Sequence, residues 1–434
     1  MSDIKNRFTG ETPEPLNEGP GGKVISFGFA KTFVSFKNPV YRMYYFSMAG
    51  HWSSMNMMIF ARNLLVFRIS DSAAILGILA LANAVPMILL TLPGGVLADR
   101  FSKKNIIQIC QIISILISAG ITIVIFTGYL GPEHPESWWV LVVSGALQGG
   151  VMGVMMPARS AIISEIVAPE HLMNAISLNN LGMNVFRVLS PALAGVLVDV
   201  VGFWVVYAIM TGMVIVSWAF LLFVPASPHR ITEGGGNSLK AIIEGWRYIR
   251  SEKTLLVVLL FTAVVMILGA PYNQLLPVFS DKILKVSATS LGVMIAVSGV
   301  GAIVGSLILA SLTNRKRGMV LFFSVLLLGV ALIVFSFSRW WYLSLFVIIF
   351  IGMGSTVQMA LGNSLVQYYS EAAYRGRVMG FFMLGFGFSS LGAFFAGLLA
   401  QGIGAPWAVG SLAIVLVIFT LVLLASNKRI RELD

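Results

Sequence analysis

Long apolar runs separated by short polar stretches fill the chain from residue 41 onward. Each run reaches about 20 residues, the length that an α-helix needs to cross the hydrocarbon core of a bilayer. Together with the Gly, Pro and charged residues between them, the runs predict twelve membrane-spanning helices at 41–67, 73–98, 104–128, 138–163, 174–199, 203–224, 255–280, 288–312, 318–338, 340–367, 376–401 and 405–426. The pattern therefore predicts an all-α membrane protein.

The longest polar stretch between two runs divides the twelve predicted helices into six and six. It holds a Gly run typical of a linker, followed by "SLKAIIEGWRYI", which has the spacing of a short amphipathic helix. We expect six-helix bundles at 41–224 and 255–426, a cytoplasmic linker at 225–254, and cytoplasmic tails at 1–40 and 427–434. Residues 27–37 mix Phe and Lys, and either lie along the membrane surface or form an ordered linker.

The two predicted halves repeat each other in the same direction. The sequence "AGVLVDVVG" (194–202) returns as "AGLLAQGIG" (396–404), and "PEHLMNAISL" (169–178) falls on "EAAYRGRVMG" (371–380) at the same offset. The pattern predicts two pseudo-symmetric bundles. Parallel six-helix repeats are typical of secondary transporters that bind their substrate between the halves.

Composition and charge agree with a membrane location. The 434 residues are 57% hydrophobic and 11% charged, with a mean hydropathy of +0.89, whereas soluble domains are about 25% charged. The net charge of +11 reflects topology rather than nucleic-acid binding, because most of the 29 Lys and Arg fall on the side of the two termini, which marks the cytoplasm. The exceptions are Arg68, Lys282, Lys285 and Arg339 on the opposite side, and Arg62 and Arg187 within spans.

Several classes of chemistry are excluded. One cysteine and four scattered histidines form no metal-ligand pattern, so we expect no metal site and no cofactor. The chain has no P-loop, no H-E-x-x-H and no G-x-S-x-G sequence. We therefore expect a protein that is not an enzyme.

The fifth predicted span carries the first candidate binding residues. Asn180, Asn184 and Arg187 are spaced i, i+4 and i+7 and share one helical face. Polar groups within a span usually face a cavity or a partner, so this face is expected to line the central site, with Arg187 attracting an anionic or polar group of the substrate. The alternative is that Arg187 caps carbonyl groups or pairs within the protein.

The first span offers His51, Asn56 and Arg62 as further candidates. His51 is the one histidine in a predicted span, and an unperturbed histidine titrates near pH 6.5, which makes protons a candidate coupling ion. The alternative is a hydrogen-bonded histidine that only packs. No Asp or Glu stands near the middle of a predicted span, where a proton carrier is common.

The seventh and tenth spans supply candidates from the second half. In "GAPYNQLLP" (269–277) two prolines flank Tyr272, Asn273 and Gln274. A proline interruption frees backbone groups that a cavity, water or neighbours must satisfy, so this segment is either a binding site or a simple kink. Gln358 in the tenth span is a weaker candidate.

The stretch "GGVLADRFSKKN" (94–105) resembles the signature loop between spans two and three of the major facilitator superfamily, with Gly95, Asp99, Arg100, Lys103 and Lys104 at the matching positions. The segments "MPARSAIISEIVAPEHLMNAISL", "RVLSPALAGVL" and "RGRVMGFFML" resemble its exporter branch of siderophore and macrolide efflux pumps. Two positions depart from the proton-coupled drug antiporters. Gly145 replaces the arginine before Gln148–Gly149, and Ser190–Pro191 replaces a Gly–Pro. These departures argue against the standard antiport mechanism.

The resemblance implies the major facilitator fold and a conformational latch in the signature loop. Lys103 and Lys104 serve topology, whereas Asp99 is expected to join the halves in the outward-facing state. Its natural partners are Arg375 and Arg377, which begin the eleventh span with the positive end of the helix dipole.

These observations predict a secondary active exporter of amphipathic, drug-like or siderophore-like small molecules that works by alternating access. The alternatives are an importer or lipid transporter of the same fold, or a membrane binding or signalling protein that does not transport. The expected partners are a small-molecule substrate and the bilayer of the cell membrane, and the expected state is a monomer.

Overall fold

The computed structural model describes residues 33–225, 238–312 and 316–426, and in these ranges the chain forms helices joined by short loops, without a strand. Parts of the predicted tails and linker lie outside the described residues. They are residues 1–32 of the tail predicted at 1–40, residues 226–237 of the linker, and the tail at 427–434. The elements are η1 (Val34–Lys37), α2 (Pro39–Ser70), α3 (Ala73–Arg100), α4 (Lys103–Phe126), η2 (Pro135–Ser137), α5 (Trp138–Ile166), η3 (Pro169–His171), α6 (Leu172–Leu222), α7 (Ser238–Ser251), α8 (Lys253–Gly269), α9 (Tyr272–Val278), the π-helix η4 (Phe279–Leu284), α10 (Ala288–Ser311), α11 (Arg317–Phe337), α12 (Trp341–Tyr369), α13 (Arg375–Ile403) and α14 (Ala405–Ser426).

The helices follow the predicted spans to within a few residues. Among the described residues, ten helical segments are long and apolar enough to cross a membrane. One of them contains α6, which covers the fifth and sixth predicted spans, and the 32-residue helix α2 covers the first span without being among the ten. The prediction of an all-α membrane protein is confirmed, and α7 coincides with the predicted amphipathic helix.

Local sequence explains where several helices begin and end. Asn38 precedes Pro39 and caps α2, because its side chain accepts hydrogen bonds from the backbone N–H groups of Val40 and Tyr41. Asp71 ends α2 in the left-handed conformation, with φ 49°. In the seventh predicted span the helix is interrupted at Ala270–Pro271, between α8 and α9, as the prolines of that segment suggested.

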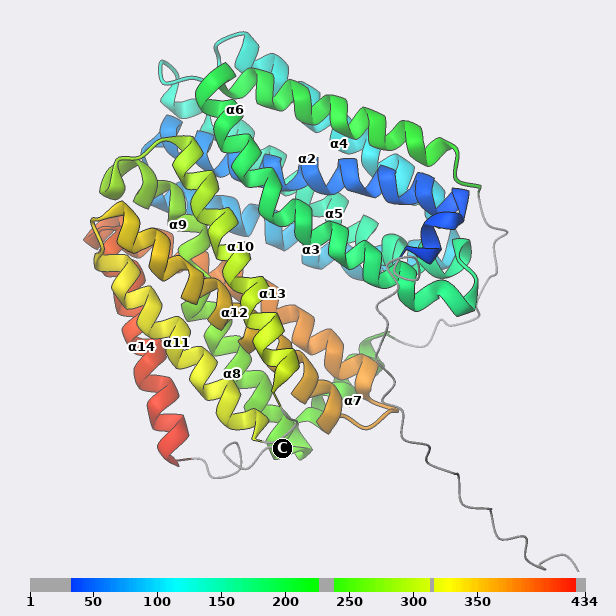
Figure 1. Cartoon of the computed structure of the whole chain (residues 1–434), viewed down its shortest axis with the longest axis vertical. Helices are drawn as coiled ribbons and strands as arrows, with labels where there is room; N and C mark the ends of the chain where they lie inside the picture. The colour runs from blue at the N-terminus through cyan, green and yellow to red at the C-terminus, as the bar shows by residue number, and fades with distance from the viewer. Residues whose placement is uncertain (1–32, 226–237, 313–315, 427–434) are drawn as a thin grey trace, which may run out of the picture.

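The helices form two groups that meet along two helix pairs (Figure 1). Helices α2 to α6 make up the N-terminal group, and α8 to α14 make up the C-terminal group. Between the groups, α13 packs on α3 and α10 packs on α6. Helix α7 lies against α13 and α8 at the far end of the C-terminal group.

The sequence repeat has a structural counterpart in the backbone. Gly202 breaks α6 with φ 78°, and Gly404 separates α13 from α14 with φ 85°. These glycines end the two copies of the repeat, and only glycine adopts such angles without strain. The fifth and sixth predicted spans are therefore joined in the same way as the eleventh and twelfth.

Candidate functional site

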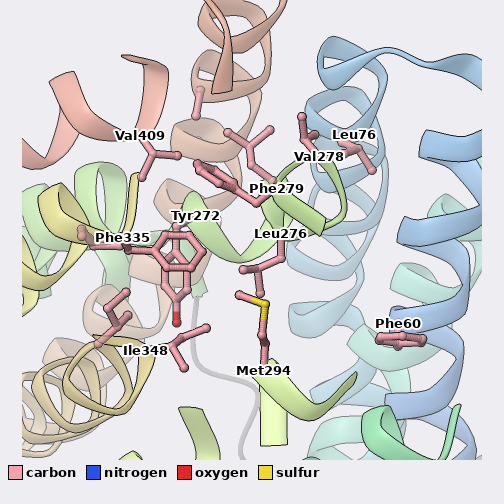
Figure 2. Close-up of a cluster of buried hydrophobic side chains, with 14 of the residues drawn as sticks. Phe60, Leu76, Tyr272, Leu276, Val278, Phe279, Met294, Phe335, Ile348 and Val409 are labelled. Carbon is pink, nitrogen blue, oxygen red and sulfur yellow. The ribbon is translucent and has the colours of Figure 1, made fainter. Parts of the chain in front are cut away.

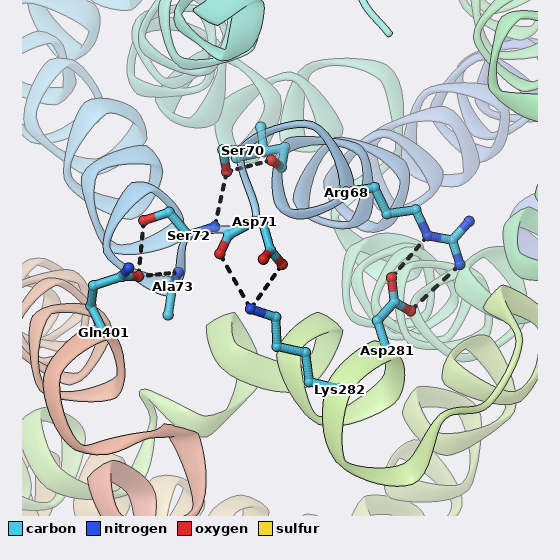
Figure 3. A network of polar contacts seen from close by, with 9 residues as sticks. Arg68, Ser70, Asp71, Ser72, Ala73, Asp281, Lys282 and Gln401 are labelled. Atoms are coloured by element: carbon cyan, nitrogen blue, oxygen red, sulfur yellow. Dashed lines mark hydrogen bonds and ion pairs between the residues drawn. The ribbon is translucent and has the colours of Figure 1, made fainter. Parts of the chain in front are cut away.

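The two helix groups are held together at one end, which we call the Arg68 end; the opposite end is the Asp99 end. Arg68 Nε lies 3.0 Å from Asp281 Oδ2, and Lys282 Nζ lies 2.8 Å from Asp71 Oδ1 (Figure 3). Arg68 belongs to α2 and Asp71 follows its last residue, and both pair with residues of η4. Both of these ion pairs between the groups therefore lie at the Arg68 end.

Two side chains at the Arg68 end cap a helix of the opposite group. Asp199 of α6 accepts hydrogen bonds from the backbone N–H groups of Ala288 (3.2 Å) and Thr289 (2.7 Å), where α10 begins. Gln401 of α13 accepts one from the backbone N–H of Ala73 (3.1 Å), where α3 begins. Asp199 and Gln401 occupy matching positions of the sequence repeat, so the closure of this end follows the pseudo-symmetry of the chain.

Glycines allow the groups to touch backbone to backbone near the Arg68 end. A Cβ atom on Gly195 of α6 would lie 2.4 Å from the carbonyl oxygen of Ala288, and one on Gly397 of α13 would lie 2.6 Å from the carbonyl oxygen of Ala73. Farther from this end the contacts are made by side chains, since Gly299 meets Val188 and Gly387 meets Ile88. The two helix pairs therefore separate toward the Asp99 end.

Helix α9 contacts both groups, since it packs on α2 and α3 and also on α13 and α14. Tyr272 and Leu276 of α9 lie in a buried apolar cluster with Phe279 of η4, Met294 of α10 and Leu76 of α3 (Figure 2). The interruption at Pro271 sets α9 apart from α8. This segment thus belongs to the contact between the groups rather than to the interior of one group.

Polar side chains from both groups meet beside α9. The Tyr272 side chain lies near Ser298 on α10, near Asn273 and near Arg187 on α6. Gln274 and Asn63 of α2 face each other with a nitrogen–oxygen distance of 3.4 Å, and Gln274 also donates to the carbonyl of Leu76 (3.0 Å). The structure therefore brings Arg187, Tyr272 and Asn273 together, and places Gln274 alongside.

In the described structure, no hydrogen bond joins the other predicted site residues to Arg187 or Tyr272. Asn180 and Asn184 are exposed on α6, on the Asp99 side of Arg187. Asn56 is partly buried and donates to the carbonyl oxygen of Trp52 at 2.8 Å. Gln358 is buried in α12, and its Nε2 has no hydrogen-bond partner among the described residues.

His51 and Arg62 lie inside the N-terminal group rather than between the groups. Arg62 is 3% exposed, beside Gly145 and Tyr207. His51 is 2% exposed, and both of its ring nitrogens lack a partner among the described residues. A charged residue that the sequence reasoning missed, Arg159 of α5, interacts electrostatically with His51.

Arg159 corrects the assignment of charged residues to spans. Arg62 and Arg187 were the arginines predicted to lie within spans, yet Arg159 lies seven residues before the end of α5 and is 8% exposed. Its Cζ is 5.9 Å from the centre of the Trp52 ring, a cation–π arrangement. The signal was present, because residue 159 falls within the predicted span 138–163.

In the described residues no ion pair joins Asp99 to its predicted partners Arg375 and Arg377. Asp99 is exposed at the end of α3, and Arg377 of α13 pairs with Glu244 of α7 at 3.1 Å. The basic residues of the loop serve the N-terminal group, since Lys103 pairs with Glu165 and Lys104 Nζ donates to the carbonyl of Leu222 (2.9 Å). The remaining residues of the latch are exposed or partly buried at the Asp99 end: Gly95, Arg100 and Arg375.

Within the signature loop, the glycine that packs closely is Gly94 rather than Gly95. A Cβ atom on Gly94 would lie 2.7 Å from the Cα of Val154 in α5, whereas a Cβ atom on Gly95 would meet nothing within 4 Å.

The described residues contain no group of three or more His, Cys, Asp or Glu that would hold a metal ion.

Comparison with known proteins agrees with this geometry. Residues 30–434 match the sequence profile of the family described as "Transmembrane secretion effector". The chain is similar to the staphyloferrin A transporter of Staphylococcus aureus, with 24% identity over 376 residues that cover 85% of this chain and 91% of the relative. It is also similar to the enterobactin exporter EntS of Escherichia coli O1:K1, with 26% identity over 290 residues that cover 66% of this chain and 67% of the relative.

Solved structures show the same fold at low identity. A POT family transporter in complex with 5-aminolevulinic acid superimposes with a TM-score of 0.72 and 13% identity, covering 90% of this chain and 96% of that chain. A bacterial homologue of the lysosomal transporter Spinster, in an inward-facing and occupied conformation, superimposes with a TM-score of 0.69 and 13% identity, covering 91% of this chain and 98% of that chain.

Proposed function

Because this chain belongs to the transmembrane secretion effector family of the major facilitator superfamily, and is an integral membrane transporter rather than an enzyme, we propose that it exports amphipathic small molecules by alternating access. The observation that carries the proposal is the seam between the two helix groups. It is closed at the Arg68 end, it separates toward the Asp99 end, and it holds Arg187 and Tyr272 between the two.

The proposed orientation places the Asp99 end in the cytoplasm. This end carries Arg100, Lys103, Arg317 and Arg375, and the basic excess of membrane proteins faces the cytoplasm. Both termini are then cytoplasmic, and the site opens toward the cytoplasm, from which an exporter takes its cargo. The expected location is the cell membrane.

The proposed substrate carries an acidic or strongly polar group on an apolar body. Arg187 is exposed at the seam, and among the described residues it forms no ion pair with an acidic side chain. A charge of this kind within a span usually serves a ligand or a partner. Asn180 and Asn184 on the same face of α6 add hydrogen-bonding groups, and the apolar residues around α9 supply the complementary surface. The relatives named for staphyloferrin A and enterobactin point to siderophore-like cargo.

Proteoliposomes with an imposed pH gradient test this proposal. A library of siderophore-like and drug-like acids is first screened by thermal stabilisation of the purified protein, and the hits are then tested for movement against their own gradient. Arg187→Gln is expected to weaken stabilisation by the acidic hits about tenfold or more, the loss expected for a charge-assisted contact. Arg339→Gln, in the exposed loop between α11 and α12, is the matched control and is expected to behave as the wild type.

Three results would count against the proposal. Movement of the hits only toward the cytoplasmic side indicates an importer. Binding without movement in liposomes of several lipid compositions indicates a protein that binds or signals without transport. Equal stabilisation of the wild type and Arg187→Gln by every acidic hit removes Arg187 from the site.

A further inference from the structure

Arg62 is a buried charge without a counter-charge in the described structure. It lies eight residues before the end of α2, inside the N-terminal group, and is 3% exposed. Its Nε and Nη1 atoms have no hydrogen-bond partner among the described residues. A guanidinium group stays protonated in proteins, and a buried ion without a partner carries a large free-energy penalty. The position therefore calls for an anion.

The described part of the N-terminal group does not supply that anion. Its carboxylates lie in loops or near helix ends, and none of them forms an ion pair with Arg62. They are Asp71, Asp99, Glu133, Glu136, Glu165, Glu170 and Asp199.

A second unpartnered donor lies beside Arg62. Tyr207 of α6 is 0% exposed, its hydroxyl has no hydrogen-bond partner among the described residues, and it is close enough to Arg62 for the two to interact electrostatically. A phenol hydroxyl and a guanidinium N–H group both donate hydrogen bonds. Two buried groups on different helices therefore offer donors to the same region.

A glycine also lies next to the Arg62 guanidinium. Gly145 of α5 faces the guanidinium, and a Cβ atom there would lie 3.5 Å from Nη1 and 3.6 Å from Cζ of Arg62. The same Cβ atom would lie 2.8 Å from Leu79 of α3, which is itself buried. Arg62, Leu79, Gly145 and Tyr207 belong to α2, α3, α5 and α6, so the guanidinium lies among four helices of the N-terminal group.

We propose that Arg62 and Tyr207 bind a small monovalent anion, such as chloride, inside the N-terminal group. The Nε–H and Nη1–H groups of Arg62 and the hydroxyl of Tyr207 donate hydrogen bonds to it. The ion neutralises the guanidinium and links α2 to α6. It is a resident ion and not the cargo, so this proposal stands or falls separately from the proposed export activity.

The test is the thermal unfolding of the full-length purified protein in chloride and in gluconate at constant ionic strength. A ligand that binds the folded state raises the unfolding temperature with its concentration, so we expect a rise that saturates with chloride. Arg62→Met keeps the length of the side chain and is expected to abolish the chloride dependence, whereas the control Arg339→Met, in the exposed loop between α11 and α12, is expected to retain it.

A second variant keeps the test decisive if Arg62→Met does not fold. Tyr207→Phe removes one hydroxyl and is expected to weaken the apparent affinity for chloride about tenfold, the loss expected for one hydrogen bond to a charged group. Equilibrium binding of radioactive chloride measures the affinity directly. We expect one saturable ion per wild-type protein.

Specific outcomes overturn the proposal. One is a wild-type protein whose unfolding temperature is the same in chloride and gluconate and which binds no radioactive chloride. Another is a chloride dependence that is unchanged in both Arg62→Met and Tyr207→Phe, because the ion then acts elsewhere. Competitive displacement of the chloride by an acidic substrate also overturns it, since Arg62 would then belong to the cargo site.

Discussion

Substitution of Gly195 by alanine is expected to weaken the closure of the Arg68 end. A Cβ atom at Gly195 would lie 2.4 Å from the carbonyl oxygen of Ala288, 3.0 Å from its carbonyl carbon and 3.1 Å from the Cα of Thr289. All three atoms are backbone, so no change of side-chain rotamer relieves the contact and α6 must move away from α10. Overpacking of this kind costs about 1–3 kcal/mol. A cost of about 2 kcal/mol lowers the ratio of closed to open Arg68 ends roughly thirtyfold.

Distances between spin labels measure this shift. Thr127 and Arg339 are exposed at the Arg68 end, one on each helix group, and Ala168 and Ala372 are exposed at the Asp99 end in the same arrangement. Because Cys110 is a buried free cysteine, the labelled pairs are introduced in a Cys110→Ser background. In Gly195→Ala we expect longer distances between Thr127 and Arg339, and shorter distances between Ala168 and Ala372.

Two further glycines serve as controls. A Cβ atom on Gly149 would lie 1.9 Å from the carbonyl oxygen of Asn83, but this contact joins α5 to α3 within the N-terminal group. Gly149→Ala is therefore expected to lower the unfolding temperature without moving the label distances. Gly212 has nothing within 4 Å, so Gly212→Ala is expected to change neither quantity. Unchanged distances in Gly195→Ala, or an equal shift in Gly149→Ala, would refute the reasoning.

Three predictions concern the charges at the ends of the seam. Asp199→Asn is expected to lower the ratio of closed to open Arg68 ends about tenfold, because the charged acceptor of three hydrogen bonds from Ala288 and Thr289 is worth about 1.5 kcal/mol at an exposed site. Asp281→Asn removes a partly exposed ion pair with Arg68 and is expected to change the ratio less than about fivefold; the reverse order in the label distances would contradict the ranking. Asp99→Asn is expected to slow transport severalfold while sparing substrate binding, because Asp99 is exposed at the Asp99 end, away from Arg187. Loss of thermal stabilisation by substrate in a folded Asp99→Asn protein would contradict a latch.

The spans were predictable because the bilayer imposes a length and an apolar composition on every crossing helix. The interruption before α9 followed from Pro271, and Gly202 and Gly404, which end the two copies of the sequence repeat, both have positive φ. Arg159 was missed for a physical reason. A long basic side chain near the end of a span usually reaches the interface, whereas here it turns inward against Trp52.

The candidate site was only partly readable from the sequence. Helical spacing placed Asn180, Asn184 and Arg187 on one face, because that relation is local. The meeting of Arg187 with Tyr272 and Ser298 depends on how α6 packs against α9 and α10, and no spacing along the chain specifies such a contact. Ser298 carried no signal, because serine is common where membrane helices pack.

The two halves share a backbone repeat but differ in charge, and this difference suggests how they divide the work. Within the described spans, the N-terminal group holds Arg62 and Arg159 in its interior and Arg187 at the seam, whereas the charged residues of the C-terminal group lie at helix ends. At matching positions of the repeat, Asp199 caps α10 with a charge, and Gln401 caps α3 with a neutral amide. We infer that the N-terminal group recognises the polar part of the cargo and that the C-terminal group offers an apolar surface around α9. Rocking of unlike halves then breaks few strong ion pairs at the seam, because the cross-group pairs of Asp281 and Lys282 are at least partly exposed and each contributes little. Opening such a seam costs little free energy. The binding of the cargo, rather than the protein's own ion pairs, then determines which end is closed.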